Sequence, residues 1–124
     1  MDPITRARIN DGMRDTLAEV LGRDVQDPRV AGVTVTGVQV TQDLAYAKVF
    51  FTCLERAHVP EAEAGLRRAT GFLRSQLGRR IKIWTTPELR FVYDESIERG
   101  DRLSRLIDRA NSESSTKPTD PAEG

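Results

Sequence analysis

The chain has 124 residues, of which 38% are hydrophobic and 31% charged, and its 19 basic residues balance its 19 acidic residues. This size and composition exclude a multidomain machine and a disordered chain, and no apolar run is long enough to cross a bilayer. The single cysteine excludes an internal disulfide, and the N-terminal segment lacks the apolar core of a signal peptide. We therefore expect one globular, cytoplasmic domain with no membrane association.

The first predicted element is an amphipathic helix over residues 3–21. Pro3 follows an aspartate, which is a typical helix start, and Gly22 supplies a stop signal. Between them, the apolar positions at helical spacing are Ile9, Met13, Leu17, Val20 and Leu21. The next stretch, residues 24–32, is rich in proline, glycine and aspartate, so it is predicted to be a loop.

Two β-rich segments follow, residues 33–41 and residues 46–54. Apolar and polar residues alternate in the first segment, but the parity changes across Gly37, which predicts a bulge or sharp twist there. Residues 42–45 form a short turn between the two segments. The pattern predicts an antiparallel hairpin.

A second helix is predicted to open near Pro60 and to end at Gly78. Its period runs through Gly71, although glycine costs roughly 0.5–1 kcal/mol relative to alanine inside a helix. The apolar stripe of this helix contains Leu66, Ala69, Leu73 and Leu77. Residues 81–84 are predicted to form a short strand, and residues 88–94 a longer strand with alternating apolar positions.

A third helix begins at Asp94 or Ser96 and is predicted to present an apolar stripe. The stripe consists of Leu103, Leu106, Ile107 and Ala110. Residues 111–124 have no periodic apolar face, so we expect a folded domain over residues 1–110 and a disordered polar tail. The order of elements predicts an α+β fold in which helices cover one face of a small sheet.

The sequence offers little material for catalysis. His58 is the only histidine, and nothing near it indicates the orienting group that a nucleophilic Cys53 would require. One cysteine and one histidine are too few for a typical zinc site, and no phosphate-binding glycine motif follows a strand. We therefore expect no enzyme, no metal site and no cofactor.

Basic residues gather in one stretch although the net charge is zero. Between residues 67 and 82 there are six basic side chains and no acidic one: Arg67, Arg68, Arg74, Arg79, Arg80 and Lys82. Arginine grips phosphate oxygens with a planar fork, and salt screens the acids that lie more than about 10 Å away. A solvated face that only keeps the protein soluble is the alternative, and the absence of acids disfavours it. The stretch therefore predicts a surface that binds nucleic acid.

Three aromatic residues, Phe72, Phe91 and Tyr93, occupy the apolar parity of their predicted elements. Aromatic side chains at such positions are usually part of a hydrophobic core. We therefore expect core residues here and no platforms for base stacking.

Three strings in this sequence resemble the ribosome-binding factor A (RbfA) family. They are "DPRV", "VTVTGVQVTQDLAYAKVFF" and "ATGFLRSQLGRRIKIWTTPELRFVYDESIERGDRLSRLI", and the resemblance covers residues 4–109. It implies a type II KH-like domain of order αββααβ, with a three-stranded sheet and a C-terminal helix. It also implies that Ala69, Thr70 and Gly71 replace the usual GXXG loop and bend one apparent helix into two.

The resemblance further implies an assembly factor for ribosome biogenesis. Such a protein binds the immature 30S subunit near the 5′-terminal helix and the neck of 16S rRNA, and promotes late maturation and processing of this rRNA without catalysis. An assembly GTPase is a further candidate partner, and we expect a monomer. The alternative is a generic single-stranded RNA-binding KH-like module in mRNA metabolism, which the missing GXXG loop disfavours.

The candidate RNA-binding residues come from the basic stretch, with two second-rank arginines on the first helix. They are Arg67, Arg68, Thr70, Gly71, Arg74, Arg79, Arg80, Lys82, Arg6 and Arg8. Asp27 and Arg29 match the family's loop string, but a structural ion pair or a cap explains them at least equally well.

Overall fold

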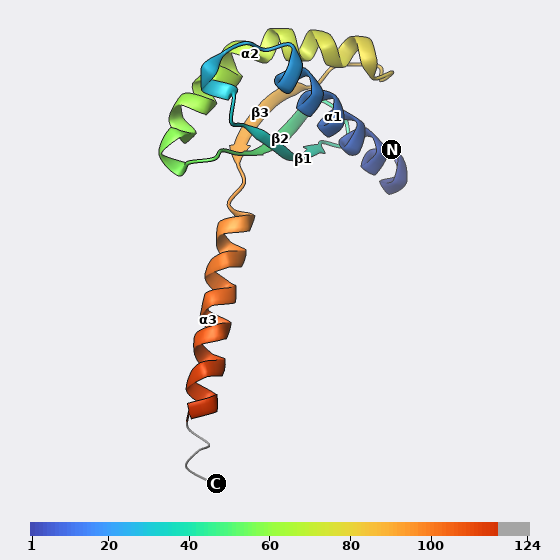
Figure 1. Ribbon diagram of the computed structural model, residues 1–124. Coiled ribbons are helices and arrows are strands. Elements are labelled where there is room, and N and C mark those ends of the chain that lie inside the picture. The colour runs from blue at the N-terminus through green and yellow to red at the C-terminus, as the bar shows by residue number, and fades with distance from the viewer. Residues whose placement is uncertain (117–124) are drawn as a thin grey trace. The chain divides into compact units, whose positions relative to one another are not determined.

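The computed structural model describes residues 1–116, and Figure 1 shows its helices and strands. The long elements are α1 (Pro3–Arg23), β1 (Thr34–Val40), β2 (Tyr46–Thr52), α2 (Val59–Arg80), β3 (Glu88–Tyr93) and α3 (Ser96–Thr116). Two short 3-10 helices are η1 (Pro28–Val30) and η2 (Arg56–His58). The chain divides into one unit over Met1–Asp94 and a second that begins at Glu95. This order confirms the predicted α+β class.

The helix α1 begins as its sequence predicts. The Asp2 carboxylate accepts a hydrogen bond from the backbone N–H of Thr5 at 2.8 Å, and Pro3 occupies the first turn. The helix ends at Arg23, two residues later than predicted. Its buried side chains form one stripe, which consists of Met13, Leu17, Val20 and Leu21.

The hairpin and its bulge are confirmed. Strand β1 pairs antiparallel with β2, and the register shifts between Val35 and Gly37, so Thr36 is the extra residue. The extra residue changes the parity of the strand, which lets Val35 and Val38 both face the core. The backbone N–H of Thr41 donates to the carbonyl of Tyr46 at 2.9 Å and closes the turn.

Strand β3 pairs parallel to β2, so β2 is the central strand of a three-stranded sheet. Leu89 is buried, and Phe91 and Tyr93 are half-buried and pack against the core, as the alternation predicts. The predicted strand over residues 81–84 is wrong, because no strand is assigned there. The side chain of Ile81 lies beside α1 at Gly12, so this segment packs on a helix and has no strand to pair with.

Both α1 and α2 lie on one face of the sheet and share one core with it (Figure 1). The strands contribute alternate residues to this core, with one step of three positions across the bulge in β1: Val35, Val38, Val40, Ala47, Val49, Phe51 and Leu89. The helix α2 contributes Ala62, Leu66, Leu73 and Leu77. Burying each valine, leucine or phenylalanine side chain of this set stabilises the fold by roughly 1.5–3 kcal/mol. Phe91 and Tyr93 lie on the same side of β3 as Leu89, and the residues between them face away from the two helices.

The helix α2 is continuous through Ala69, Thr70 and Gly71, so the predicted interruption into two helices is wrong. Figure 1 nevertheless shows that its green N-terminal part and its yellow C-terminal part run in different directions. The Thr70 hydroxyl donates to the carbonyl of Leu66 at 3.1 Å, and such a bond to the preceding turn often bends a helix. The helix therefore bends without losing its helical hydrogen bonding.

The helix α3 continues past the predicted domain boundary at residue 110 and ends at Thr116. Residues 111–116, predicted as tail, are therefore helical, and residues 117–124 lie outside the described residues. Three apolar side chains of α3 are more than half exposed: Leu103, Leu106 and Ile107. The predicted stripe exists, but it is no part of the buried core.

Candidate RNA-binding surface

Three arginines project from α2, and no hydrogen bond or ion pair within residues 1–116 engages their side chains. These are Arg67, Arg68 and Arg79, and all three are exposed. Lys82, two residues beyond the helix, is exposed and equally unpaired in the described part of the chain. We call these four residues the α2 cationic surface. Their donors are available to phosphate oxygens, which is what the basic stretch predicts.

Arg74 has a structural role that the sequence does not reveal. Its Nε donates to the carbonyl of Pro87 at 3.0 Å, and its Nη2 donates to the carbonyl of Thr86 at 2.9 Å. These bonds tie α2 to the segment that leads into β3. The guanidinium of Arg74 is therefore held in place by the protein, whereas that of Arg67, two helical turns earlier, is not.

Arg80 and Arg6 are also held by the protein itself. Arg80 donates to Glu19 at 2.6 Å and so joins the end of α2 to α1. The Nε and Nη2 atoms of Arg6 donate to the carbonyl of Val40, at 2.9 and 2.6 Å, and join α1 to β1. Arg8 is exposed and has no such partner in the described residues. Predicted RNA-binding arginines thus divide into structural and free ones.

The three residues of the predicted kink differ in their surroundings. Ala69 is half-buried and packs against the core, whereas Gly71 is exposed and a Cβ built on it meets nothing within 4 Å. Thr70 uses its hydroxyl for the bond to Leu66. The structure therefore gives Thr70 a role in the shape of α2 and places no neighbour that would require glycine at position 71.

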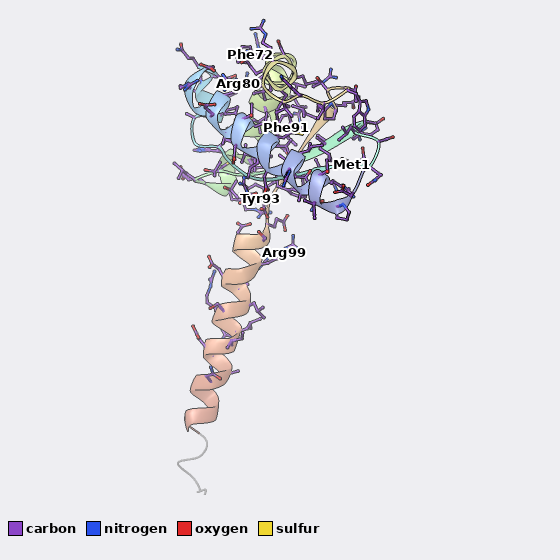
Figure 2. All side chains as sticks on the ribbon, turned by 90° about the vertical axis from the view of Figure 1, so that its right-hand side faces the viewer. Met1, Phe72, Arg80, Phe91, Tyr93 and Arg99 are labelled. Carbon is purple, nitrogen blue, oxygen red and sulfur yellow. The ribbon has the colours of Figure 1, made fainter. Side chains whose placement is uncertain are left out.

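A groove of about 500 Å³ lies beside α2, between this helix and the loop before η1. Arg68, Ala69 and Phe72 line its helix side, and residues 24–29 line its other side. Phe72 is 44% exposed, so its assignment to the core is wrong (Figure 2). Position 72 lies one residue before Leu73 and off the line of the apolar stripe, and this offset is the sequence signal that could have identified it.

Asp27 and Arg29 form the structural ion pair that the sequence leaves open. The Asp27 carboxylate accepts the backbone N–H of Arg29 at 3.0 Å and the Arg29 Nη2 at 2.7 Å. The side-chain hydrogen bonds from Arg29, with its backbone N–H, lower the pKa of Asp27 to about 2. Asp27 therefore caps η1 and holds Arg29 in place.

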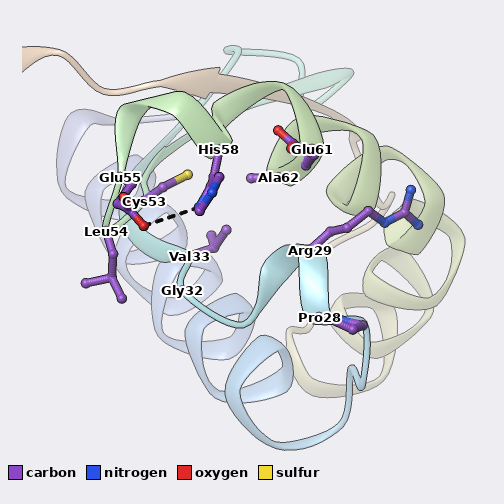
Figure 3. Close-up of a pocket in the computed structure, with 10 residues that line it drawn as sticks. All are labelled: Pro28, Arg29, Gly32, Val33, Cys53, Leu54, Glu55, His58, Glu61 and Ala62. Atoms are coloured by element: carbon purple, nitrogen blue, oxygen red, sulfur yellow. Dashed lines mark ion pairs between the residues drawn. The ribbon is translucent and has the colours of Figure 1, made fainter.

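Cys53 and His58 line a second cavity, of about 460 Å³, which Figure 3 shows. His58 Nδ1 lies 3.7 Å from Glu55, and no hydrogen bond joins His58 to Cys53 in the described residues. Burial raises the pKa of the Cys53 thiol, and the charge of Glu63 raises it further. The thiol therefore stays protonated near neutral pH, which is the opposite of what a nucleophilic cysteine needs.

Residues 1–116 contain neither a cluster of metal ligands nor a membrane-spanning helix. Over residues 1–116, no group of three or more histidine, cysteine, aspartate or glutamate side chains is placed to hold a metal ion. No helix in the same range is both long and apolar enough to cross a membrane.

Comparison with known proteins identifies relatives for almost the whole chain. The family model for ribosome-binding factor A matches residues 5–107. The ribosome-binding factor A of Dechloromonas aromatica is 51% identical over 111 residues, covering 90% of each chain. That of an Azoarcus species is 55% identical over 104 residues, covering 83% of this chain and 82% of the relative.

Solved structures agree with these relatives. The crystal structure of ribosome-binding factor A from Thermus thermophilus aligns with a TM-score of 0.65 at 26% identity, covering 71% of this chain and 94% of that one. A solution structure of a candidate ribosome-binding factor A from Thermotoga maritima aligns with a TM-score of 0.66 at 31% identity. The alignment covers 79% of this chain and 95% of that one. The family match, the sequence identities and the shared fold together show that this chain belongs to the ribosome-binding factor A family.

Proposed function

We propose that this protein is an assembly factor for the small ribosomal subunit. It binds the immature 30S subunit through 16S rRNA, near the 5′-terminal helix and the neck, and promotes late maturation and processing of that rRNA. The observation that carries the proposal is the α2 cationic surface, whose four basic side chains form no hydrogen bond or ion pair within residues 1–116. Each phosphate that such a side chain neutralises releases counterions and favours binding.

The relatives support this choice of partner. The Thermus thermophilus ribosome-binding factor A, 26% identical to this chain with a TM-score of 0.59, has been fitted as a homology model into a cryo-EM map of a 30S–RbfA complex. A family of this name is expected to bind the ribosome. We extend the partner to this chain because its fold and its free arginines suit a large, phosphate-rich surface.

The proposed mechanism uses binding energy and no bond chemistry. A protein that binds one arrangement of rRNA more tightly than another shifts the population toward the favoured arrangement. The protonated Cys53 thiol supports a non-catalytic role, since the cavity around it holds no activated nucleophile. The proposal includes a monomer that acts in the cytoplasm, with an assembly GTPase as a candidate for triggering release.

Co-sedimentation with purified small subunits tests the proposal. The variant Arg67→Glu, Arg79→Glu reverses two free charges, and we expect it to lose co-sedimentation at moderate salt while it unfolds at the wild-type temperature. Arg74 is left unchanged because it holds the segment before β3. The matched control is Arg23→Glu, an exposed arginine paired with Glu19 on α1, which should sediment like the wild type.

Two outcomes would contradict the proposal. Unchanged co-sedimentation of the Arg67→Glu, Arg79→Glu variant would show that the α2 cationic surface is not the binding face. Equal competition by unstructured RNA would favour the alternative of a general single-stranded RNA-binding module.

A further inference from the structure

A hollow lies near the turn of the hairpin, between Arg6 at the start of α1 and the exposed residues of the sheet face that the two helices leave uncovered. Its volume is about 490 Å³, and we call it the sheet-face groove. Its polar lining consists of Arg6, Gln39, Thr41, Tyr46, Lys48 and Arg90. No acidic residue lines it, so the groove attracts anions although the whole chain has no net charge.

Strand register brings these side chains together from distant parts of the sequence. Gln39 of β1 is opposite Lys48 of β2, and Lys48 is opposite Arg90 of β3. All three side chains are exposed, while their strand neighbours Val38 and Leu89 face the core. One row of the open face therefore contains two adjacent cations and an amide.

Two like charges at paired positions of neighbouring strands are unfavourable in the free protein. Glu88 compensates part of this charge: its carboxylate lies 3.5 Å from Arg90, and both side chains are 61% exposed. Exposed pairs of this kind contribute little. No ion pair engages Lys48 within residues 1–116, so the row retains positive charge that an anionic ligand would neutralise.

An aromatic side chain lies beside this charge. Tyr46 is 43% exposed, and the guanidinium carbon of Arg90 lies 4.6 Å from the centre of its ring. Arg6 completes the rim, because it uses Nε and Nη2 for Val40 and leaves Nη1 for an incoming group. An exposed ring with cations around it suits a nucleic-acid strand, since a base offers a flat face and a phosphate offers oxygens. An acidic peptide offers only the second of these.

We propose that the sheet-face groove is a second RNA-binding site. It holds the phosphates of a single-stranded segment with Lys48, Arg90 and Arg6, and it stacks a base on the face of the Tyr46 ring that Arg90 does not cover. The inference rests on the proposed rRNA-binding function and adds to it a contact on the face of the sheet opposite to α2.

The test measures binding of the full chain to fluorescent oligouridine over a series of salt concentrations. For Lys48→Gln, Arg90→Gln, we expect the plot of log affinity against log salt to become less steep by about 1.4. The reason is that each phosphate contact on a single strand contributes about 0.7 to the steepness of this plot. For Tyr46→Leu, we expect affinity to fall about tenfold with an unchanged slope, because stacking carries no charge. Arg23→Gln is the matched control and should change neither quantity.

The outcomes separate this proposal from the proposed function. If the groove variants bind oligouridine like the wild type, or if the wild type does not bind it, the second site is wrong. Co-sedimentation of the Arg67→Glu, Arg79→Glu variant with small subunits tests the proposed function independently. Polyglutamate serves as the competing anion. If it binds as tightly as oligouridine, and if the groove variants lose this binding too, the choice of RNA is wrong and an acidic protein partner is indicated.

Discussion

Val30 packs so closely against Gly65 that a Cβ atom built on the glycine would lie 2.8 Å from Val30 Cγ1. Val30 belongs to η1 and is buried, so this contact holds η1 against α2. Glycine is therefore required at position 65 by a close approach, even though the backbone there is ordinary helix.

Gly65→Ala should destabilise the protein by about 1–3 kcal/mol, because the extra methyl group overpacks the contact. The loss occurs although alanine is the better helix former. Chemical denaturation followed by circular dichroism measures it. A variant as stable as the wild type would show that η1 moves away without cost.

Gly71→Ala is the matched control in the same helix, and its effect on the free energy of unfolding should have the opposite sign. Nothing lies within 4 Å of a Cβ at Gly71, so the substitution should stabilise the protein by roughly 0.5–1 kcal/mol. The same denaturation experiment applies. A destabilised variant would mean that the bend of α2 depends on glycine, and unchanged subunit binding would exclude a direct role for Gly71.

Arg74→Ala should destabilise the protein by about 1–3 kcal/mol, because it removes charge-assisted hydrogen bonds to the carbonyls of Thr86 and Pro87. Arg67→Ala lacks such contacts and should stay within about 0.5 kcal/mol of the wild type. Thermal unfolding compares the two variants. Equal stabilities would contradict the division into structural and free arginines.

The Asp27–Arg29 pair should make the stability of the protein depend on pH in the acidic range. Its hydrogen bonds hold the pKa of Asp27 at about 2, below its ordinary value of 3.8, so the ionised pair contributes above about pH 4. The contribution is lost as pH falls from about 4 to about 2. The free energies of unfolding of the wild type and of Asp27→Asn should therefore converge as the pH falls over this range. A constant difference between them would contradict this assignment.

Lys48→Glu should separate stability from binding. It replaces a like-charge pair with a carboxylate beside Arg90, so the free protein should gain about 0.2–1 kcal/mol. The same change should weaken RNA binding at the sheet-face groove. Thermal unfolding and the oligouridine assay measure the two effects, and a variant that loses stability would contradict the like-charge argument.

The periodicity of the sequence predicted most elements of the fold. Residues such as Leu17 on α1 and Leu89 on β3 repeat at the spacing of their own element, and this local pattern is sufficient to identify it. The predicted strand at residues 81–84 failed because a short apolar run packs equally well against a helix. Phe72 was misassigned because one helical position separates the core face from the surface.

The sequence by itself determined the order of elements, the bulge at Gly37 and the basic stretch of α2. Only the tertiary structure decided which arginines are free. Arg74 and Arg6 find their acceptors in carbonyl groups 12 to 34 positions away, and Lys48 meets Arg90 only through the sheet register. Hydrogen bonds and cross-strand pairs depend on distances in space, whereas periodicity records only the neighbours along one element.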